Sequence, residues 1–211
     1  MDMLIPVYHQ WCDMIFDGKK TVEFRKRPWK SLKTGDKFYF YEPKRFQGSG
    51  LVVGHATIQD TIPVHPCSHV NRKLLRYWAE FVRKDQELVG NIDLLDGFII
   101  SGSTERFSYD YIYSKEAIQY IKSHDKHPSI SGIDYETLCK AQKMQQDYEQ
   151  WQKEIGFRDP NGESPYFVGY ALTDPVRYAE PHLIEEFKNQ AGKYMNKAPQ
   201  SGCYIIPPCN L

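Results

Sequence analysis

The chain has 211 residues and a mass of 24.7 kDa, with 41% hydrophobic and 26% charged residues. These values are ordinary for a globular protein, so the composition excludes a disordered chain, and the length suits one domain with insertions or two small domains. Lys and Arg total 27, as do Asp and Glu, so no overall positive charge directs the protein toward nucleic acid.

The first predicted elements are a helix and three strands. Residues 8–18 predict a short helix because Trp11, Met14 and Ile15 recur at helical spacing and Gly18 follows as a stop signal. The strands are predicted over residues 21–27, about 37–42 and 51–62. Short glycine-containing turns join them, which favours a small antiparallel sheet curling toward a barrel.

The middle of the chain predicts more helix. A first helix is predicted to be capped by Asn71, and its apolar side is formed by Leu74, Leu75, Trp78, Phe81 and Val82. Strands are predicted at 97–102 and 106–113, a short helix at 114–123 and a long helix at 134–155. The apolar stripe of the long helix is interpreted as core packing. The same amphipathic helix is also the basis of an alternative in which the protein is an interaction scaffold.

The last part of the chain alternates loop, strand, helix and strand. Residues 158–165 predict a loop, 166–174 a strand, 180–190 a short helix and 201–207 a final strand. The sequence shows neither an internal repeat nor a low-complexity tract. The predicted fold class is therefore mixed α+β.

Positive charge is concentrated in one segment of this neutral chain. Residues 18–33 contain seven cations and a single anion, Glu23, a local excess of +6. Such a run is either a solvated face or an anion-binding surface.

The same segment places charges on one side of a strand. Because side chains alternate along a strand, Val22 and Phe24 are predicted to face the core, which leaves Thr21, Glu23 and Arg25 on the other side. Lys20 stands at the turn before the strand. Surface charge pairs of this kind contribute only ~0–1 kcal/mol. A groove in which cations hold an anion is the alternative, and in that case Lys20 and Arg25 are expected to be solvated.

The spacing Gly18-x-Lys20-x-x-Glu23-x-Arg25 resembles the signature of ASCH domains (activating signal cointegrator homology), of the bacterial and phage type, a branch of the PUA-like superfamily. The resemblance covers roughly the first 65 and the last 45 residues. It implies a single domain over residues 1–211, built as a small, mostly antiparallel PUA-like β-barrel with surrounding helices. A helix-rich elaboration of about residues 70–159 would separate the N-terminal and C-terminal barrel strands.

The resemblance implies binding of RNA, a nucleotide or a nucleoside in a basic cleft. Some small bacterial members of the family hydrolyse N4-acetylcytidine and others are described as ribonucleases. If this chain is an enzyme, Lys20 and Glu23 are the predicted catalytic residues, although the threonine nucleophile of the amidohydrolases is replaced by Glu23. The predicted ligand-binding residues are Lys20, Thr21, Glu23, Arg25, Lys26, Arg27, Trp29, Tyr39 and Tyr41.

Other features of the sequence indicate no cofactor and no membrane span. His65, Cys67 and His69 are spaced like metal ligands, but no second ligand pair accompanies them, so no metal is predicted. No phosphate loop or dinucleotide fingerprint is present. Five scattered cysteines and the absence of a signal peptide favour a cytoplasmic protein. The sequence indicates nothing about protein partners.

Overall fold

A computed structural model describes residues 1–65, 71–84, 135–159, 161, 163–209 and 211. The chain divides into two compact units, the first formed by Met1–Val64 with Pro165–Leu211 and the second by His65–Ser164. The strands predicted at 97–102 and 106–113 and the helix at 114–123 lie outside the described residues. The organisation as one domain with an elaboration at 70–159 stays a prediction.

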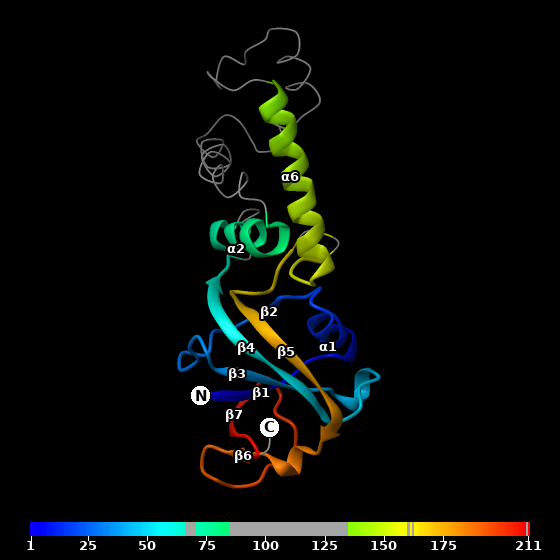
Figure 1. Cartoon of the computed structure of the whole chain (residues 1–211), viewed down its shortest axis with the longest axis vertical. Coiled ribbons are helices and arrows are strands. Elements are labelled where there is room, and N and C mark those ends of the chain that lie inside the picture. Colours follow the sequence, from blue (N-terminus) through cyan, green and yellow to red (C-terminus); the bar gives the residue numbers. More distant parts are fainter. Residues whose placement is uncertain (66–70, 85–134, 160, 162, 210) are drawn as a thin grey trace. The chain divides into compact units, whose positions relative to one another are not determined.

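The first unit is built on one seven-stranded sheet (Figure 1). In spatial order the strands are β2, β5, β4, β3, β1, β7 and β6. Their bounds are β1 Asp2–Pro6, β2 Val22–Arg25, β3 Lys37–Tyr41, β4 Val52–Pro63, β5 Val168–His182, β6 Lys188–Asn189 and β7 Cys203–Ile206.

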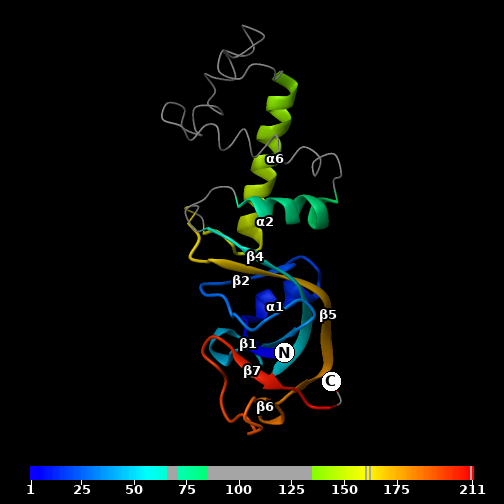
Figure 2. The same cartoon turned by 90° about the vertical axis from the view of Figure 1, so that its left-hand side faces the viewer.

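The pairing of these strands is antiparallel except between β1 and β3. β4 and β5 are the longest strands and run side by side along a strong bend, which three register shifts accommodate (Figure 2). Among the described residues the two edge strands, β2 and β6, do not pair with each other, so the ladder does not close. The predicted α+β class and the mostly antiparallel sheet are confirmed.

The strand β1 has no counterpart among the predicted elements, although it lies inside the sheet between β3 and β7. Met3, Leu4 and Ile5 are at most 1% exposed. A strand buried on both faces has a continuous apolar run instead of an alternating one, and this run is too short to distinguish a strand from a helix by periodicity.

Two apolar clusters form the core of the first unit. The larger is covered by α1 (His9–Phe16), whose Cys12 and Ile15 pack against Phe38 and Phe40 of β3 and their neighbours. The smaller lies around Tyr39, whose ring packs against Phe187. Both faces of β3 are therefore buried.

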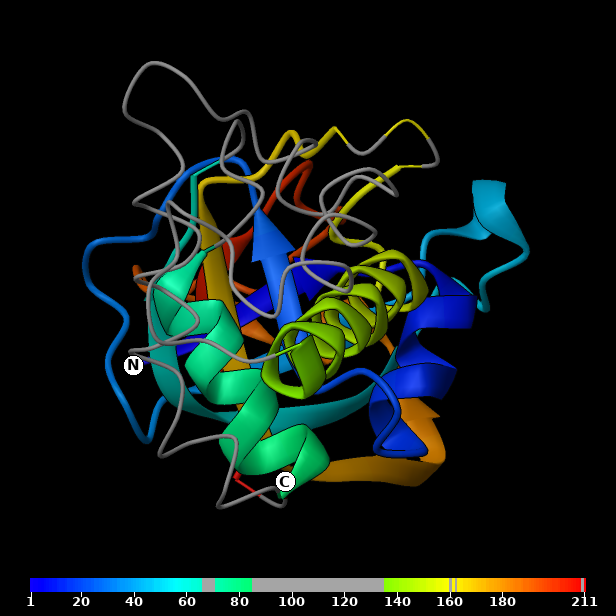
Figure 3. The same ribbon diagram turned by 90° about the horizontal axis from the view of Figure 1, so that it is seen from above.

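The described part of the second unit consists of helices (Figure 3), which pack through aromatic side chains. It contains α2 Arg72–Tyr77, the π-helical turn η2 Trp78–Arg83 and α6 Tyr135–Glu154. Trp78 of η2 lies 5.3 Å from Tyr148 of α6 and 6.5 Å from Trp151, measured between ring centroids. The predicted core role of the long helix is confirmed for Tyr148 and Trp151.

One detail of the first predicted helix of this unit is wrong, and a second holds only in part. Phe81 and Val82 were assigned to its packed side, but they are 44% and 37% exposed because the π-helical turn changes the helical spacing beyond Tyr77. Asn71 occupies the N-cap position, as predicted, but its side chain forms no capping hydrogen bond. Its side-chain oxygen instead accepts a hydrogen bond from the backbone N–H of His65 at 2.6 Å.

The helix predicted over residues 180–190 is also wrong. β5 continues to His182, and only the 3-10 turn η3 Ile184–Glu186 precedes the short strand β6. Asp174, at a positive φ of 48°, and Pro175 occur within β5, where the predicted strand ended. In the part of the chain that the structure describes, no helix is long and apolar enough to cross a membrane.

Candidate functional site

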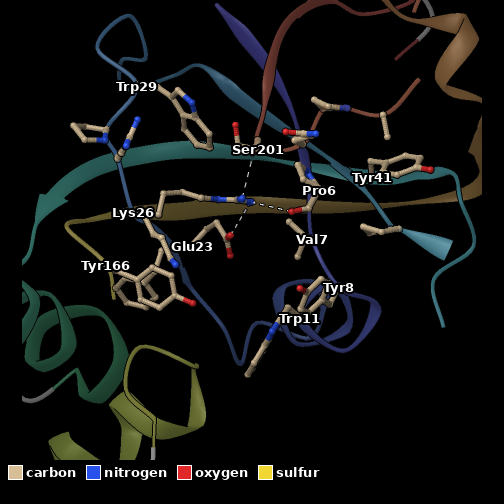
Figure 4. A pocket seen from close by; sticks show the side chains of 18 of the residues that line it. Pro6, Val7, Tyr8, Trp11, Glu23, Lys26, Trp29, Tyr41, Tyr166 and Ser201 are labelled. Carbon is tan, nitrogen blue, oxygen red and sulfur yellow. Dashed lines mark hydrogen bonds and ion pairs between the residues drawn. The ribbon is translucent and has the colours of Figure 1, made fainter. Parts of the chain in front are cut away.

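A pocket of about 940 Å³ opens in the first unit at the end of β2 (Figure 4). Its walls come from the β1–α1 junction, β2 and the loop after it, the end of β3, the segment before β5 and the segment before β7. The lining residues are Pro6, Val7, Tyr8, Trp11, Glu23, Phe24, Arg25, Lys26, Arg27, Pro28, Trp29, Tyr41, Pro43, Arg45, Tyr166, Ala198, Pro199, Gln200 and Ser201.

An ion cluster of Lys20, Glu23 and Arg25 lies at the bottom of this pocket and below it. Glu23 Oε1 is 2.9 Å from Arg25 Nη2, and Glu23 Oε2 is 3.8 Å from Lys20 Nζ. The Glu23 side chain is only 10% exposed, and the carboxylate points into the pocket (Figure 4). The predicted association of these three side chains is present in the structure.

Lys20 is buried, which contradicts the expectation that it is solvated. It is 4% exposed and does not line the pocket. Its ammonium lies 5.3 Å from the ring centroid of Trp11 and 5.1 Å from that of Phe24, both within the range of cation–π contacts. Burial lowers the pKa of Lys20 to about 8, although the nearby Glu23 carboxylate opposes this change. Lys20 therefore supports the pocket from behind.

Arg25 connects three segments of the first unit. Besides its ion pair with Glu23, its Nη2 donates to the carbonyl oxygen of Pro6 at 3.1 Å, and its Nη1 donates to that of Ser201 at 3.4 Å (Figure 4). The guanidinium thus joins β2 to the end of β1 and to the segment before β7. The planar fork of an arginine suits this role, which a lysine ammonium does not reproduce.

Six aromatic side chains form the walls of the pocket: Tyr8, Trp11, Phe24, Trp29, Tyr41 and Tyr166. Phe24 and Tyr166 pack together with ring centroids 5.8 Å apart. Burial, and next the charge of Glu23, raise the pKa of the Tyr166 hydroxyl, so this hydroxyl stays protonated. Phe24 was predicted to face the core. It is buried as expected, but it also lines the pocket.

Trp29 is held in place from two sides. Its backbone N–H donates to the Tyr170 hydroxyl at 2.8 Å, and the two rings stack at 5.7 Å. The Arg25 guanidinium lies 5.4 Å from the Trp29 ring centroid on the pocket side of the sheet. This wall is preorganised because a ring fixed by neighbours loses little freedom when a ligand binds.

Three exposed cations, Lys26, Arg27 and Arg45, form a basic rim around the pocket. The first two belong to the predicted positive segment. Three other cations of that segment do not line the pocket: Lys19 pairs with Asp17 at 3.2 Å, and Lys30 and Lys33 are exposed outside it. With the buried Lys20, four of the seven cations of the positive segment therefore lie outside the pocket lining.

Besides Lys20, the structure separates two further predicted ligand-binding residues, Tyr39 and Thr21, from the pocket. Tyr39 is 1% exposed and belongs to the smaller core cluster, where burial raises its pKa to about 12. Thr21 precedes β2, and its carbonyl accepts a hydrogen bond from the N–H of Leu172. The other predicted residues, Glu23, Arg25, Lys26, Arg27, Trp29 and Tyr41, all line the pocket.

Four lining aromatics were missing from the prediction: Tyr8, Trp11, Phe24 and Tyr166. Trp11 was assigned to the packed side of a helix, and Tyr166 to the start of a distant strand. The adjacency of the β1–α1 junction to β2 depends on the tertiary fold, and no local pattern indicates it.

The described ranges contain no group of three or more His, Cys, Asp or Glu side chains that could hold a metal ion. His65 is described, whereas its possible co-ligands Cys67 and His69 lie outside the described residues.

Comparisons with known proteins point to one family. A family model described as the ASCH domain matches residues 5–201. A solved ASCH structure from Zymomonas mobilis is 15% identical, with a TM-score of 0.41, and covers 97% of this chain and 87% of its own. Two single-residue variants of that protein give TM-scores of 0.42 at 14% identity, covering 97% of this chain and 90% or 88% of theirs. No curated protein matches the chain significantly.

Proposed function

The chain belongs to the ASCH domain family, and from this premise we propose that it binds single-stranded RNA or a nucleotide in the pocket at the end of β2. The observation that carries the proposal is the combination of six aromatic walls with an exposed basic rim. Aromatic faces stack on bases, and Lys and Arg side chains contact phosphates.

The arrangement of the charges supports a ligand that is partly anionic and partly aromatic. The rim cations Lys26, Arg27 and Arg45 are exposed, so a phosphate can reach them without rearrangement of buried side chains. Deeper in the pocket, the charge of Arg25 is already balanced by Glu23. A phosphate is therefore expected at the rim and a base between the aromatic walls.

Binding of a fluorescent single-stranded RNA oligomer, measured by anisotropy at several salt concentrations, tests the proposal. We expect log K to fall linearly with log[salt], with a slope of roughly −0.7 for each phosphate contact. Affinity at low salt no greater than that of a neutral control protein would contradict it.

A matched pair of tyrosine variants localises the binding. Tyr8 is 40% exposed and lines the pocket, whereas Tyr194 is 65% exposed and lies outside it. Tyr8→Ala is expected to weaken binding by about 1–3 kcal/mol, the range for the loss of one stacked base. Tyr194→Ala is expected to leave the affinity unchanged. Equal losses in both variants would place the binding site elsewhere.

A second candidate function is hydrolysis of a modified nucleoside or of RNA in the same pocket. The observation in its favour is the lowered pKa of Lys20, whose ammonium lies 3.8 Å from Glu23, since groups with a perturbed pKa beside a charged partner are enriched in active sites. Glu23 would act as general base toward water, and Arg25 would stabilise the developing negative charge. Turnover of N4-acetylcytidine, or RNA cleavage, that disappears in Glu23→Gln would establish this function.

A further inference from the structure

The Glu23 carboxylate retains acceptor positions that face the pocket. A carboxylate offers about four positions at which it accepts hydrogen bonds. Oε1 forms an ion pair with Arg25 Nη2 at 2.9 Å. Oε2 lies 3.8 Å from the Lys20 ammonium, which is longer than a hydrogen bond. The pocket therefore contains a recessed group that can only accept.

A ligand that covers Glu23 has to supply donors, because an acceptor that loses its contact with water and gains no partner is costly. The Watson–Crick edges of the four RNA bases differ in this respect. Guanine presents two adjacent donors, N1–H and the N2 amino group. Adenine and cytosine present one amino group beside a ring nitrogen that accepts, and uracil presents one N–H between two carbonyls. A carboxylate matches guanine best.

Arg25 adds a donor beside the carboxylate. Nη2 donates one hydrogen to the Pro6 carbonyl and forms an ion pair with Glu23, and Nη1 donates one hydrogen to the Ser201 carbonyl. One Nη1 hydrogen remains among these described contacts. Guanine carries an acceptor, O6, next to its N1–H. The pair of Glu23 and Arg25 thus offers two acceptor positions followed by a donor, which is complementary to the guanine edge.

The walls around Glu23 favour a flat ring over a sugar. A carboxylate can also accept hydrogen bonds from the hydroxyls of a ribose. Here, however, Phe24, Tyr166 and Trp11 line the same pocket as the carboxylate, and the rings of Phe24 and Tyr166 pack at an angle of 31°. Aromatic faces of this kind stack on a base. Building on the function proposed above, we infer that the pocket is selective for guanine, whose Watson–Crick edge binds Glu23 and Arg25.

Calorimetric titration of the parent protein with nucleoside monophosphates tests this selectivity without any substitution. We expect GMP to bind roughly five- to 100-fold more tightly than UMP, AMP or CMP, the discrimination given by a two-point hydrogen-bonded contact. IMP, which lacks the N2 amino group, should fall between GMP and UMP. Deoxy-GMP should bind within about twofold of GMP, because the inference assigns no role to the 2′-hydroxyl in the contact with Glu23.

A variant reverses the preference by exchanging one acceptor for a donor. In Glu23→Gln the side-chain amide offers one acceptor and one donor, which matches the N1–H and O2 of xanthine. We expect the ratio of GMP to XMP affinity to fall by at least tenfold in this variant. Glu180→Gln, at an exposed position of β5, serves as the control and should keep the parent ratio. If Glu23→Gln fails to fold, the titrations of the parent protein decide alone.

Each other outcome overturns the inference in a different way. Equal affinity for all four monophosphates removes the guanine selectivity and leaves the proposed nucleotide binding intact. A loss of binding with deoxy-GMP as large as that with UMP assigns Glu23 to the ribose. Absence of binding to every monophosphate and to the RNA oligomer overturns both the selectivity and the proposed function.

Discussion

The ion cluster and two cations of the basic rim, Lys26 and Arg27, lie within eight residues of each other in sequence but carry their charges in different ways. Lys20 and Arg25 of the cluster have side chains that are 5% and 16% exposed, and both contact Glu23. Lys26 and Arg27 of the rim are exposed. In the sequence these four cations contribute equally to one positive segment.

The difference teaches that only part of such a segment is available to an anionic ligand. In the cluster, each cation has lost most of its hydration and is compensated by a carboxylate, so removing one partner leaves an uncompensated buried charge. In the rim, water and salt screen the charges, and substitution affects long-range attraction more than stability. Substitutions in the cluster should therefore change mainly the stability of the protein, and substitutions in the rim should change mainly its binding of an anionic ligand.

The largest effect is expected from the loss of the shared carboxylate. Glu23→Ala leaves Lys20 and Arg25 without their anion in a buried site, and we expect a decrease of about 3–5 kcal/mol in the free energy of unfolding. Urea denaturation measures it. Glu180→Ala, an exposed glutamate on β5, should change stability by less than about 0.5 kcal/mol. If both variants unfold alike, the cluster contributes no more than a surface pair.

A pH dependence is expected from Lys20. Its pKa is lowered to about 8 in the folded protein, against an ordinary value of 10.5. Between these two pH values the unfolded chain binds more protons than the folded protein, so this lysine makes stability rise with pH. Between pH 8 and pH 10.5, the free energy of unfolding of the parent should therefore rise by up to about 3 kcal/mol relative to that of Lys20→Met.

Denaturation of the parent and of Lys20→Met at a series of pH values measures this gain. Taking the difference between them cancels the titration of tyrosines and cysteines common to both proteins. Lys19→Met provides the matched control, since Lys19 is adjacent in sequence and its side chain is 68% exposed. A difference that stays constant with pH would show that Lys20 titrates normally and is not buried as a charge.

Arg25→Lys is expected to have an intermediate effect, because it keeps the charge and removes the fork. A single ammonium cannot contact Glu23, the Pro6 carbonyl and the Ser201 carbonyl together as the guanidinium does. We expect a loss of about 1.5–3 kcal/mol, the range for hydrogen bonds to a charged group. Thermal melting of Arg25→Lys and of Arg27→Lys measures the difference. Arg27 lies in the exposed rim, so Arg27→Lys should melt at the same temperature as the parent.

The smallest effect on stability is expected in the rim. Arg27→Ala should change the free energy of unfolding by less than about 0.5 kcal/mol, as surface substitutions usually do. It should reduce the salt slope of RNA binding by about 0.7, the contribution of one phosphate contact. Lys30→Ala, an exposed cation of the same segment that lies outside the pocket, should leave the slope unchanged. Equal slopes for the two variants would mean that the rim does not contact phosphates.

The sequence predicts elements with a clear period well and fails where both faces of an element are covered. The alternation in β2 and the helical stripe of α6 identify both elements, because one face of each is apolar. β1 contains the continuous apolar run Met3–Ile5 and escapes detection. In β3, alternation predicts that Tyr39 faces the cleft if Phe38 faces the core, but each residue packs into a different core cluster.

The candidate site is predictable only in its local part. Glu23, Arg25, Lys26 and Arg27 are close in sequence, so a motif and strand geometry identify them, whereas the third rim cation, Arg45, lies beyond β3 and was not predicted. The burial of Lys20 depends on Trp11 of α1, and the opposite wall depends on Tyr166, which is more than a hundred residues away. Contacts across such separations depend on the tertiary fold, and a local pattern carries no information about them.

The pairing of β4 with β5 has a consequence for the order in which the protein can fold during synthesis. These strands flank the second unit, so the ribosome makes all of His65–Ser164 between them. Until β5 emerges, β4 has β3 on one side only, and its other edge stays open to unwanted pairing. We expect slow completion of the sheet, because closing so long a segment costs entropy before any pairing with β5 forms. The nascent chain is therefore expected to depend on chaperones until its last quarter has been translated.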